Sequence, residues 1–246
     1  MKSVLRYIGQ KDIDITKYNI NESKIYVEPF GGSFNTGFNL IDQGYKGRLI
    51  YNDLDNNVYN FWVQVRDSVE QLSKYIETLE YIVNKLKSKI ERERAIMDWL
   101  NDSDCVKRAA AEYIYRYYLT MNGLSFARVI DSFFKLDLIL ASELLSKIEL
   151  YNTDARDIIK EFDSSVTFML IDPPYKVKGV NSYYRCNSSK FNHQDLYEKI
   201  KSLKSKWLLT YNKDECIKEL YKSYDIEEVN RIIMGKQYKE YYIKNY

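Results

Sequence analysis

The chain has few of the residues that interrupt or cross-link a protein. Its 246 residues include 3 prolines, 9 glycines, 3 cysteines and a single histidine. The cysteines, at positions 105, 186 and 216, are odd in number and widely spaced, so neither a disulfide framework nor a metal site is expected. A reducing, cytoplasmic setting is therefore the default. The sequence has no recognisable signal peptide, and no apolar run approaches the roughly 20 residues that span a membrane.

Charge is nearly balanced overall, with 37 Lys and Arg against 35 Asp and Glu, so the whole chain is not a polybasic binder. Residues 176–222 differ, because 10 Lys and 1 Arg there face only 2 Asp and 3 Glu. Tyr183, Tyr184, Phe191 and Trp207 are interleaved with these charges. Basic residues mixed with aromatic ones suit a nucleic-acid track, and the alternative is the solvated surface of a lysine-rich protein.

Two of the three prolines stand together in the segment Asp172-Pro173-Pro174-Tyr175. The segment follows a strand-like run at 166–171, so Asp172 is predicted at the carboxyl end of a buried strand, where open α/β sheets bind ligands. The prolines stiffen the chain and hold the neighbouring carbonyls outward. The Asp172 carboxylate and the Pro173 carbonyl could then accept both hydrogens of one amino group, while a base stacks on Tyr175. The alternative is a plain strand followed by a proline-stiffened turn.

This arrangement of acceptors favours methyl transfer to an exocyclic amine. Two acceptors draw the nitrogen lone pair out of conjugation with the ring, so the nitrogen becomes a better nucleophile without losing a proton. Both N6 of adenine and N4 of cytosine could donate to such a pair of acceptors. No cysteine has a setting that suggests a nucleophile, which counts against methylation at C5 of cytosine.

A second motif, Y-V-E-P-F-G-G-S-F-N-T-G at residues 26–37, reads as a short strand, a glycine turn and a helix that ends near Gly44. Paired glycines allow close approach of the backbone to a ligand, and a helix start favours an anion. The pattern is neither G-x-G-x-x-G nor a P-loop, so a zwitterion such as S-adenosylmethionine fits better. About 20 residues further on, Asp53 ends a second strand, where an acid can bind ribose hydroxyls.

Together these motifs resemble the Dam-type family of DNA adenine-N6 methyltransferases, the D12 class, in its α-group order with the glycine motif before D-P-P-Y. The resemblance runs nearly end to end. It also includes L-R-Y-I-G-Q-K at 5–11, N-D-L-D at 52–55, Y-L-T-M-N-G-L-S-F at 118–126, L-L-T-Y-N at 208–212 and E-Y-Y-I-K-N-Y at 240–246. Gln10 replaces a family glycine, and the longer R-Y-N-x-x-G-x-F-N-V-P-F-G stretch typical of GATC-specific relatives is lacking. The recognition sequence is therefore left open.

The resemblance implies transfer of a methyl group from S-adenosylmethionine to N6 of an adenine that is rotated out of double-stranded DNA. It implies catalysis by Asp172, Pro173, Pro174 and Tyr175. A third strand-like piece, 148–152, leads to Asp154, which could hold the cofactor's adenine amine or cap the helix that follows. The expected cofactor-binding residues are Tyr7, Lys11, Pro29, Phe30, Gly31, Gly32, Asp53, Asp154 and Asp172.

Strand-like runs that alternate with helical patterns predict an α/β fold with a Rossmann-like, doubly wound and mainly parallel sheet that ends in an antiparallel hairpin. We predict a catalytic domain over residues 1–54 and 148–246. An inserted helical target-recognition subdomain is predicted over residues 55–147. Its candidate DNA contacts, together with two lysines beyond the D-P-P-Y segment, are Arg116, Asn122, Ser125, Arg128, Lys176 and Lys178.

Residues 67–100 contain no Gly or Pro, and apolar residues recur there at steps of three and four. The pattern predicts one long helix, either packed against its own subdomain or serving as a coiled-coil arm. A monomer or a weak dimer is therefore expected. The residues of the apolar seam are Val69, Leu72, Ile76, Leu79, Val83, Leu86 and Ile90.

Three other functions are compatible with these patterns. An RNA or cytosine-N4 methyltransferase could use the same D-P-P-Y residues. A non-catalytic DNA-binding relative could have kept the fold, although the intact D-P-P-Y and Asp53 argue against it. A protein-interaction module could be built on residues 67–100. A cognate restriction endonuclease is a further conceivable partner, as in restriction-modification systems.

Overall fold

The computed structural model describes residues 3–7, 10–11, 13–14, 16–120, 135–175, 191–233 and 236–246. The chain divides into two compact units. The first unit comprises residues 1–13, 32–44 and 55–150, and the second comprises residues 14–31, 45–54 and 151–246. The predicted recognition subdomain lies within the first unit, which also takes in the amino terminus and the helix after the glycine motif.

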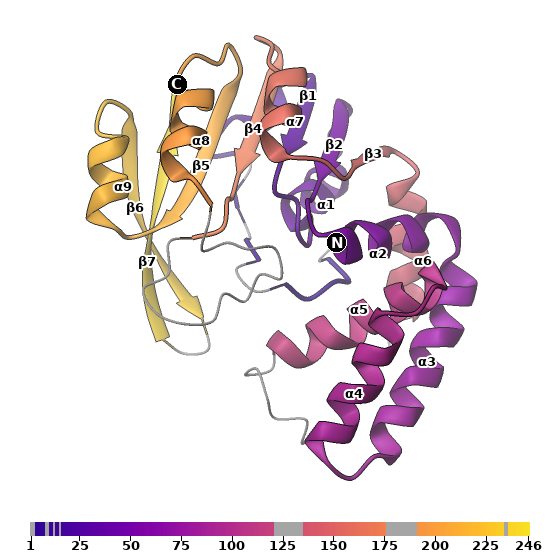
Figure 1. The fold of residues 1–246 in the computed structure, drawn as a ribbon. Coiled ribbons are helices and arrows are strands. Elements are labelled where there is room, and N and C mark those ends of the chain that lie inside the picture. Colours follow the sequence, from indigo (N-terminus) through magenta and orange to yellow (C-terminus); the bar gives the residue numbers. More distant parts are fainter. Residues whose placement is uncertain are drawn as a thin grey trace. The chain divides into compact units, whose positions relative to one another are not determined.

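A seven-stranded sheet has the strand order β3-β2-β1-β4-β5-β7-β6 (Figure 1). All of its strands lie in the second unit except β3, most of which belongs to the first. Strand β1 pairs in parallel with β2 and β4, and β4 pairs in parallel with β5. Strand β7 runs antiparallel to both β5 and β6. The predicted mainly parallel sheet with a terminal hairpin is thus confirmed. The strands are β1 (Ile25–Glu28), β2 (Arg48–Asn52), β3 (Ile148–Tyr151), β4 (Thr167–Ile171), β5 (Lys206–Asn212), β6 (Asp225–Ile233) and β7 (Lys236–Lys244).

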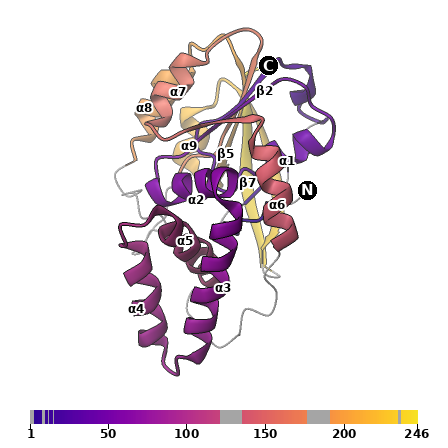
Figure 2. The same ribbon diagram turned by 90° about the vertical axis from the view of Figure 1, so that its right-hand side faces the viewer.

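One face of this sheet carries the core of the second unit. Every residue of β4 is buried, as expected for a central parallel strand that reads as a continuous apolar run. Helices α7 (Ala155–Glu161), α8 (His193–Ile200) and α9 (Glu215–Leu220) place their apolar residues against it, and α7 lies beside α8 (Figure 2). A short 3-10 turn, Ile20–Glu22, precedes β1.

The core also accounts for one wrong prediction. Trp207 was placed among the aromatics of a nucleic-acid track, but its side chain is fully buried on β5. Its ring lies 5.0 Å from that of Tyr224 and faces the helices rather than solvent. The reason is that β5 is an inner strand of the sheet and is buried on both faces, so Leu208 and Thr210 on the opposite face are buried as well.

Within the described ranges, the regular structure of the first unit is helical except for the residues of β3. Helix α5 (Cys105–Thr120) packs against α2 (Asn56–Asp67), α3 (Val69–Lys85) and α4 (Lys89–Leu100). Helix α6 (Lys135–Leu145) packs against α2, and α1 (Asn35–Asp42) follows the glycine motif. None of the described helices is long and apolar enough to cross a membrane.

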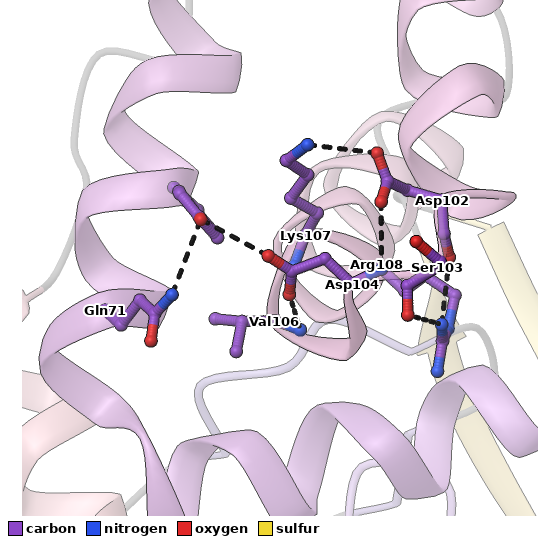
Figure 3. A network of polar contacts seen from close by, with 8 residues as sticks. Gln71, Asp102, Ser103, Asp104, Val106, Lys107 and Arg108 are labelled. Atoms are coloured by element: carbon purple, nitrogen blue, oxygen red, sulfur yellow. Dashed lines mark hydrogen bonds and ion pairs between the residues drawn. The ribbon is translucent and has the colours of Figure 1, made fainter.

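The start of α5 is fixed by a polar network (Figure 3). Asp104 accepts hydrogen bonds from the backbone N–H of Val106 at 2.8 Å and of Lys107 at 3.3 Å, which caps the helix. The hydroxyl of Tyr75, on α3, donates to the other Asp104 oxygen at 3.3 Å. The same side chain therefore caps the first turn of α5 and ties this helix to α3.

Residues 67–100 do not form the single long helix predicted above. Helix α3 ends at Lys85, Leu86 is extended, and α4 begins at Lys89. The break needs no Gly or Pro, because Ser88 and Glu91 form a capping box in which each side chain bonds the other's backbone N–H. Leu72, Ile76, Leu79 and Val83 are buried, whereas Ile90 is 71% exposed, so the apolar seam ends at the break. A continuous coiled-coil arm is therefore excluded.

We expect Ser88→Ala to lower the free energy of unfolding by about 1 kcal/mol, because the start of α4 loses its cap. The unfolding midpoint should fall by about 2–4 °C, as measured by thermal denaturation. Ser68→Ala is the matched control, since Ser68 precedes α3 without making a side-chain cap bond. Equal midpoints for the two variants would contradict the role given to the capping box.

Candidate active site

The carboxyl ends of β1, β2 and β4 bring predicted site segments to one edge of the sheet. Residues 29–31 follow β1, Asp53 follows β2, and residues 172–175 follow β4. The chain runs from β1 outward to β2 and β3, then returns to place β4 on the other side of β1. Such a reversal creates a crevice beyond the strand ends, where open α/β sheets bind ligands.

Asn52, the last residue of β2, holds these strand ends together. Its side chain is fully buried and donates to the carbonyls of Pro29 at 2.8 Å and Thr153 at 3.1 Å. Its side-chain oxygen accepts from the Thr153 N–H at 3.0 Å, and its backbone carbonyl accepts from the Gly31 N–H at 2.7 Å. The side chain and backbone carbonyl of Asn52 thus fix two loops, the one after β1 and the one after β3. No role was predicted for Asn52, although it is the first residue of the N-D-L-D segment at 52–55.

Gly31 lies where no side chain can be accommodated. A Cβ at this position would stand 2.3 Å from the Tyr51 ring and 3.0 Å from the carbonyl oxygen of Asn52. The neighbouring Gly32 has φ +48°, in the left-handed region that favours glycine. The two glycines therefore serve different purposes, one for close packing and one for the turn.

Asp53 is buried, with 9% of its surface exposed, at the end of β2. The backbone N–H of Asp53 donates to the Tyr151 carbonyl at 3.3 Å, and the Asn152 side chain donates to the Asp53 carbonyl at 2.6 Å. These bonds set the direction in which the loop leaves the strand. The backbone N–H and the carbonyl of Asp53 are thus both bonded at the end of β3, to Tyr151 and Asn152. These bonds fix where the Asp53 residue lies.

Asp154 takes the second of the two roles considered for it. Its side chain accepts from the backbone N–H of Arg156 at 2.9 Å and caps α7. It also pairs with the Arg156 guanidinium at 2.5 Å, and this bond, ahead of the cost of partial burial, lowers its pKa. Cofactor binding by Asp154 stays a prediction that would have to coexist with the cap.

Asp172 leaves the end of β4 half-buried and accepts a short hydrogen bond from the hydroxyl of Thr210, on β5. Burial raises the pKa of the Tyr175 hydroxyl well above its usual value, and the charges of Asp172 and Glu240 add to the effect. Tyr175 therefore stays neutral at physiological pH. Its ring lies 5.9 Å from that of Tyr211, which fixes the end of the D-P-P-Y segment against the core.

A chain of aromatic contacts joins the loop after β1 to the D-P-P-Y segment. Phe30 meets the edge of Phe191 at 5.7 Å, and Phe191 meets His193 at 5.2 Å. The Nδ1 atom of His193 is 2.8 Å from the hydroxyl of Tyr211, the ring next to Tyr175. Phe191 is the one aromatic of the proposed basic track that the structure brings to this site; Tyr183 and Tyr184 lie outside the described residues.

In the first unit, Tyr7 and Lys11 lie near the continuation of the glycine motif. A Cβ on Gly32 would be 3.1 Å from the Tyr7 ring, and the Trp62 indole N–H donates to the Gly32 carbonyl at 2.9 Å. Lys11 is buried, and its carbonyl accepts from the Asn35 side chain at 2.7 Å. These contacts fix the course of the amino-terminal segment beside Gly32.

Arg116 is not the surface DNA contact that the sequence suggested. Its side chain is 2% exposed and pairs with Glu112 at 2.7 Å and Asp55 at 3.0 Å. Its guanidinium also lies 4.5 Å from the centre of the Tyr7 ring. Burial lowers the pKa of Arg116, but the charges of Glu112, Tyr7 and Asp55 outweigh it, so the group stays cationic. Because its guanidinium is bound to Glu112 and Asp55 inside the helical unit, Arg116 has a structural role.

Asn122, Ser125, Arg128, Lys176 and Lys178 lie outside the residues that the structure describes. Within the described ranges, no group of three His, Cys, Asp or Glu side chains is arranged to hold a metal ion.

The described residues fit S-adenosylmethionine in their chemistry. A buried acid, Asp53, stands at a strand end where it can accept from ribose hydroxyls. Gly31 and Gly32 add no side chains to the loop after β1, where the Tyr51 and Tyr7 rings already fill the space that side chains would occupy. Asp172 adds a second carboxylate at the same edge of the sheet, so positive charge in a ligand would be favoured there.

Comparison with known families gives one match. The family model of the D12 class N6 adenine-specific DNA methyltransferases matches residues 10–234, which is most of the chain. Comparison with curated proteins gives no significant match.

We expect Arg116→Met to lower the free energy of unfolding by about 3–5 kcal/mol, because Glu112 and Asp55 would be left buried without their cation. Chemical denaturation measures the change. The matched control is Arg108→Met on the same helix, whose guanidinium donates to the Asp102 and Ser103 carbonyls and should cost about 1 kcal/mol. Similar losses in both variants would show that the buried ion pairs contribute nothing particular.

We expect Gly31→Ala to weaken S-adenosylmethionine binding by about tenfold or more, because the Tyr51 ring must move away from the new methyl group. Gly44→Ala is the control, since Gly44 has φ +83° but no atom within 4 Å of a Cβ. It should cost about 1–2 kcal/mol in stability and leave the dissociation constant unchanged. Calorimetric titration measures the dissociation constant of S-adenosylmethionine for each variant. Unchanged binding by Gly31→Ala would refute the proposed location of the cofactor loop.

Proposed function

The chain belongs to the D12 class of N6 adenine-specific DNA methyltransferases, and on that premise we propose that its active site is the carboxyl edge of β1, β2 and β4. The enzyme uses S-adenosylmethionine to methylate adenine in double-stranded DNA. The observation that carries our proposal is the position of Asp172. This carboxylate leaves a fully buried central strand directly beside the reversal of strand order, in a segment stiffened by two prolines.

Asp172 accepts one hydrogen of the target amine, and the Pro173 carbonyl accepts the other. The amine nitrogen then keeps its lone pair available for attack. Once the nitrogen carries the methyl group and S-adenosylhomocysteine is released, it must lose one of its two protons, and the Asp172 carboxylate would accept that proton. Tyr175 provides an aromatic face for the base, which contributes about 1–3 kcal/mol when a base stacks on such a ring. Its hydroxyl stays protonated through the working pH range because burial raises its pKa.

The cofactor lies beside this segment, over Pro29, Phe30 and the two glycines, with Asp53 on its ribose. Tyr7 and Lys11 contribute from the amino-terminal segment. When bound, S-adenosylmethionine supplies an electrophilic methyl group on a sulfonium sulfur. The protein's own contribution is positioning, since holding two reactants in line can supply roughly 7–11 kcal/mol of the barrier.

The target adenine is rotated out of the duplex, as enzymes that act on a base within DNA generally require. The segments around Asn122, Ser125 and Arg128, and around Lys176 and Lys178, supply phosphate and base contacts. Arg116 is no longer among these candidates. A cytoplasmic enzyme that is monomeric or weakly dimeric, with or without a partner restriction endonuclease, is consistent with this assignment.

Two alternatives differ in their products. An RNA or cytosine-N4 methyltransferase would give a different modified nucleoside from the same four residues. A non-catalytic relative would bind DNA without consuming the cofactor. Digestion of the product to nucleosides separates all three, because only the proposed reaction yields N6-methyladenine in DNA.

We expect Asp172→Ala to lower the single-turnover rate of DNA methylation by about 10²–10³-fold or more, since the amine loses one of its two acceptors. Asp225→Ala is the control, because Asp225 is an exposed acid at the start of β6 that pairs with Lys244. Labelled methyl transfer to DNA with nucleoside analysis measures the rate. Near-normal turnover by a folded Asp172→Ala variant would refute the assignment of the active site.

A further inference from the structure

The Thr210 hydroxyl is a buried polar group to which the proposed mechanism assigns no role. Thr210 lies on β5 and is fully buried. Its Oγ1 donates a short hydrogen bond to Oδ1 of Asp172. We propose that Thr210 is a positioning residue that orients the Asp172 carboxylate toward the target amine, an inference that rests on the proposed function.

The strand register explains why this contact forms. Ile171, the last residue of β4, pairs with Leu209 of β5, so Asp172 stands beside Thr210, which still lies within β5. Thr210 is also held from its other side, where it pairs with Tyr242 of β7. A donor on a strand with neighbours on both sides moves little, and a site built on such an element is more precise than one built on loops.

The hydrogen bond has a consequence for the direction of the carboxylate. The torsion that turns a carboxylate about its Cβ–Cγ bond is broad, so an Asp side chain at a chain exit has no fixed plane of its own. Donation from Thr210 to Oδ1 selects one orientation and directs the remaining acceptor capacity of the group outward from the strand ends. Asp172 itself is half-buried, in contrast to the fully buried Thr210, so it reaches toward solvent while its partner does not.

A purely structural role would predict a different pattern of losses. The β-branched shape of Thr suits a strand, and Val keeps that shape without the hydroxyl. Thr210→Val therefore removes the donor and little else, whereas Thr210→Ser keeps the donor and removes a methyl group. If shape alone mattered, Ser would be the more damaging change.

The experiment measures single-turnover methylation at saturating DNA and cofactor, together with cofactor affinity and thermal unfolding. Thr210→Val should lower the methylation rate by about 10–100-fold, the range seen when a group that orients a reactive side chain is lost, and leave cofactor affinity within about twofold. Thr210→Ser should restore most of the rate. If Thr210→Val does not fold, Thr210→Ala is the second variant without a donor.

Thr167→Val is the matched control, because Thr167 is an equally buried threonine on β4 whose hydroxyl lies 2.7 Å from that of Ser164 at the opposite end of the sheet. It should leave the methylation rate unchanged. The combination of Thr210→Val with Asp172→Asn completes a double-mutant cycle, in which the Thr210 effect should vanish because the group it acts through has been altered.

The inference is overturned by a normal rate in Thr210→Val, by equal losses in the Val and Ser variants, or by an undiminished Thr210 effect in the Asp172→Asn background. These outcomes are separable from failure of the proposed active site. If Asp172→Ala methylates DNA normally, the active-site assignment itself is wrong; if Asp172→Ala is inactive and Thr210→Val is normal, only the role of Thr210 is wrong.

Discussion

The buried Asn52 amide is the constraint on which the rest of this site depends. Parallel strands bring their carboxyl ends to one edge, but the loops that leave them carry polar backbone groups that must be satisfied when buried. Asn52 satisfies four of them, at Pro29, Gly31 and Thr153. Because one rigid side chain and its backbone serve all these groups, the glycine loop and the loop after β3 have little freedom to move apart. Asp53, the next residue, is placed by that arrangement.

The two compact units use their buried polar groups in different ways. In the sheet unit, the hydrogen bonds of Asn52 and Thr210 direct backbone and carboxylate groups toward the strand edge. In the helical unit, Arg116 binds Glu112 and Asp55 in the interior, and Asp104 joins α5 to α3. Removing one partner of a buried ion pair is costly, so the second arrangement specifies how the helices meet. The first arrangement holds the loop after β1 and the Asp172 carboxylate in place.

Much of the fold could be predicted because hydrophobic periodicity is local. The strands before D-P-P-Y and before the glycine motif, their parallel pairing and the terminal hairpin all follow from alternation and turn residues. The break between α3 and α4 was missed, since a capping box at Ser88 ended a helix that composition alone would have continued. Trp207 and Arg116 were misplaced for a related reason. A basic or aromatic residue in a polar stretch of sequence is predicted to be exposed, and its burial becomes apparent only when the packing of the folded chain is known.

The sequence by itself determined the chemistry of this protein: an acid and two prolines after a buried strand, a glycine turn after another, and the spacing that marks a methyltransferase of the D12 class. These features are legible because each depends on residues adjacent in the chain. Only the tertiary structure decided which distant side chains contact these segments. Thr210 lies 38 residues from Asp172, and Asn52 lies 101 residues from Thr153, so no local pattern relates them. Their contacts arise from strand order and register, which are fixed when the whole sheet assembles.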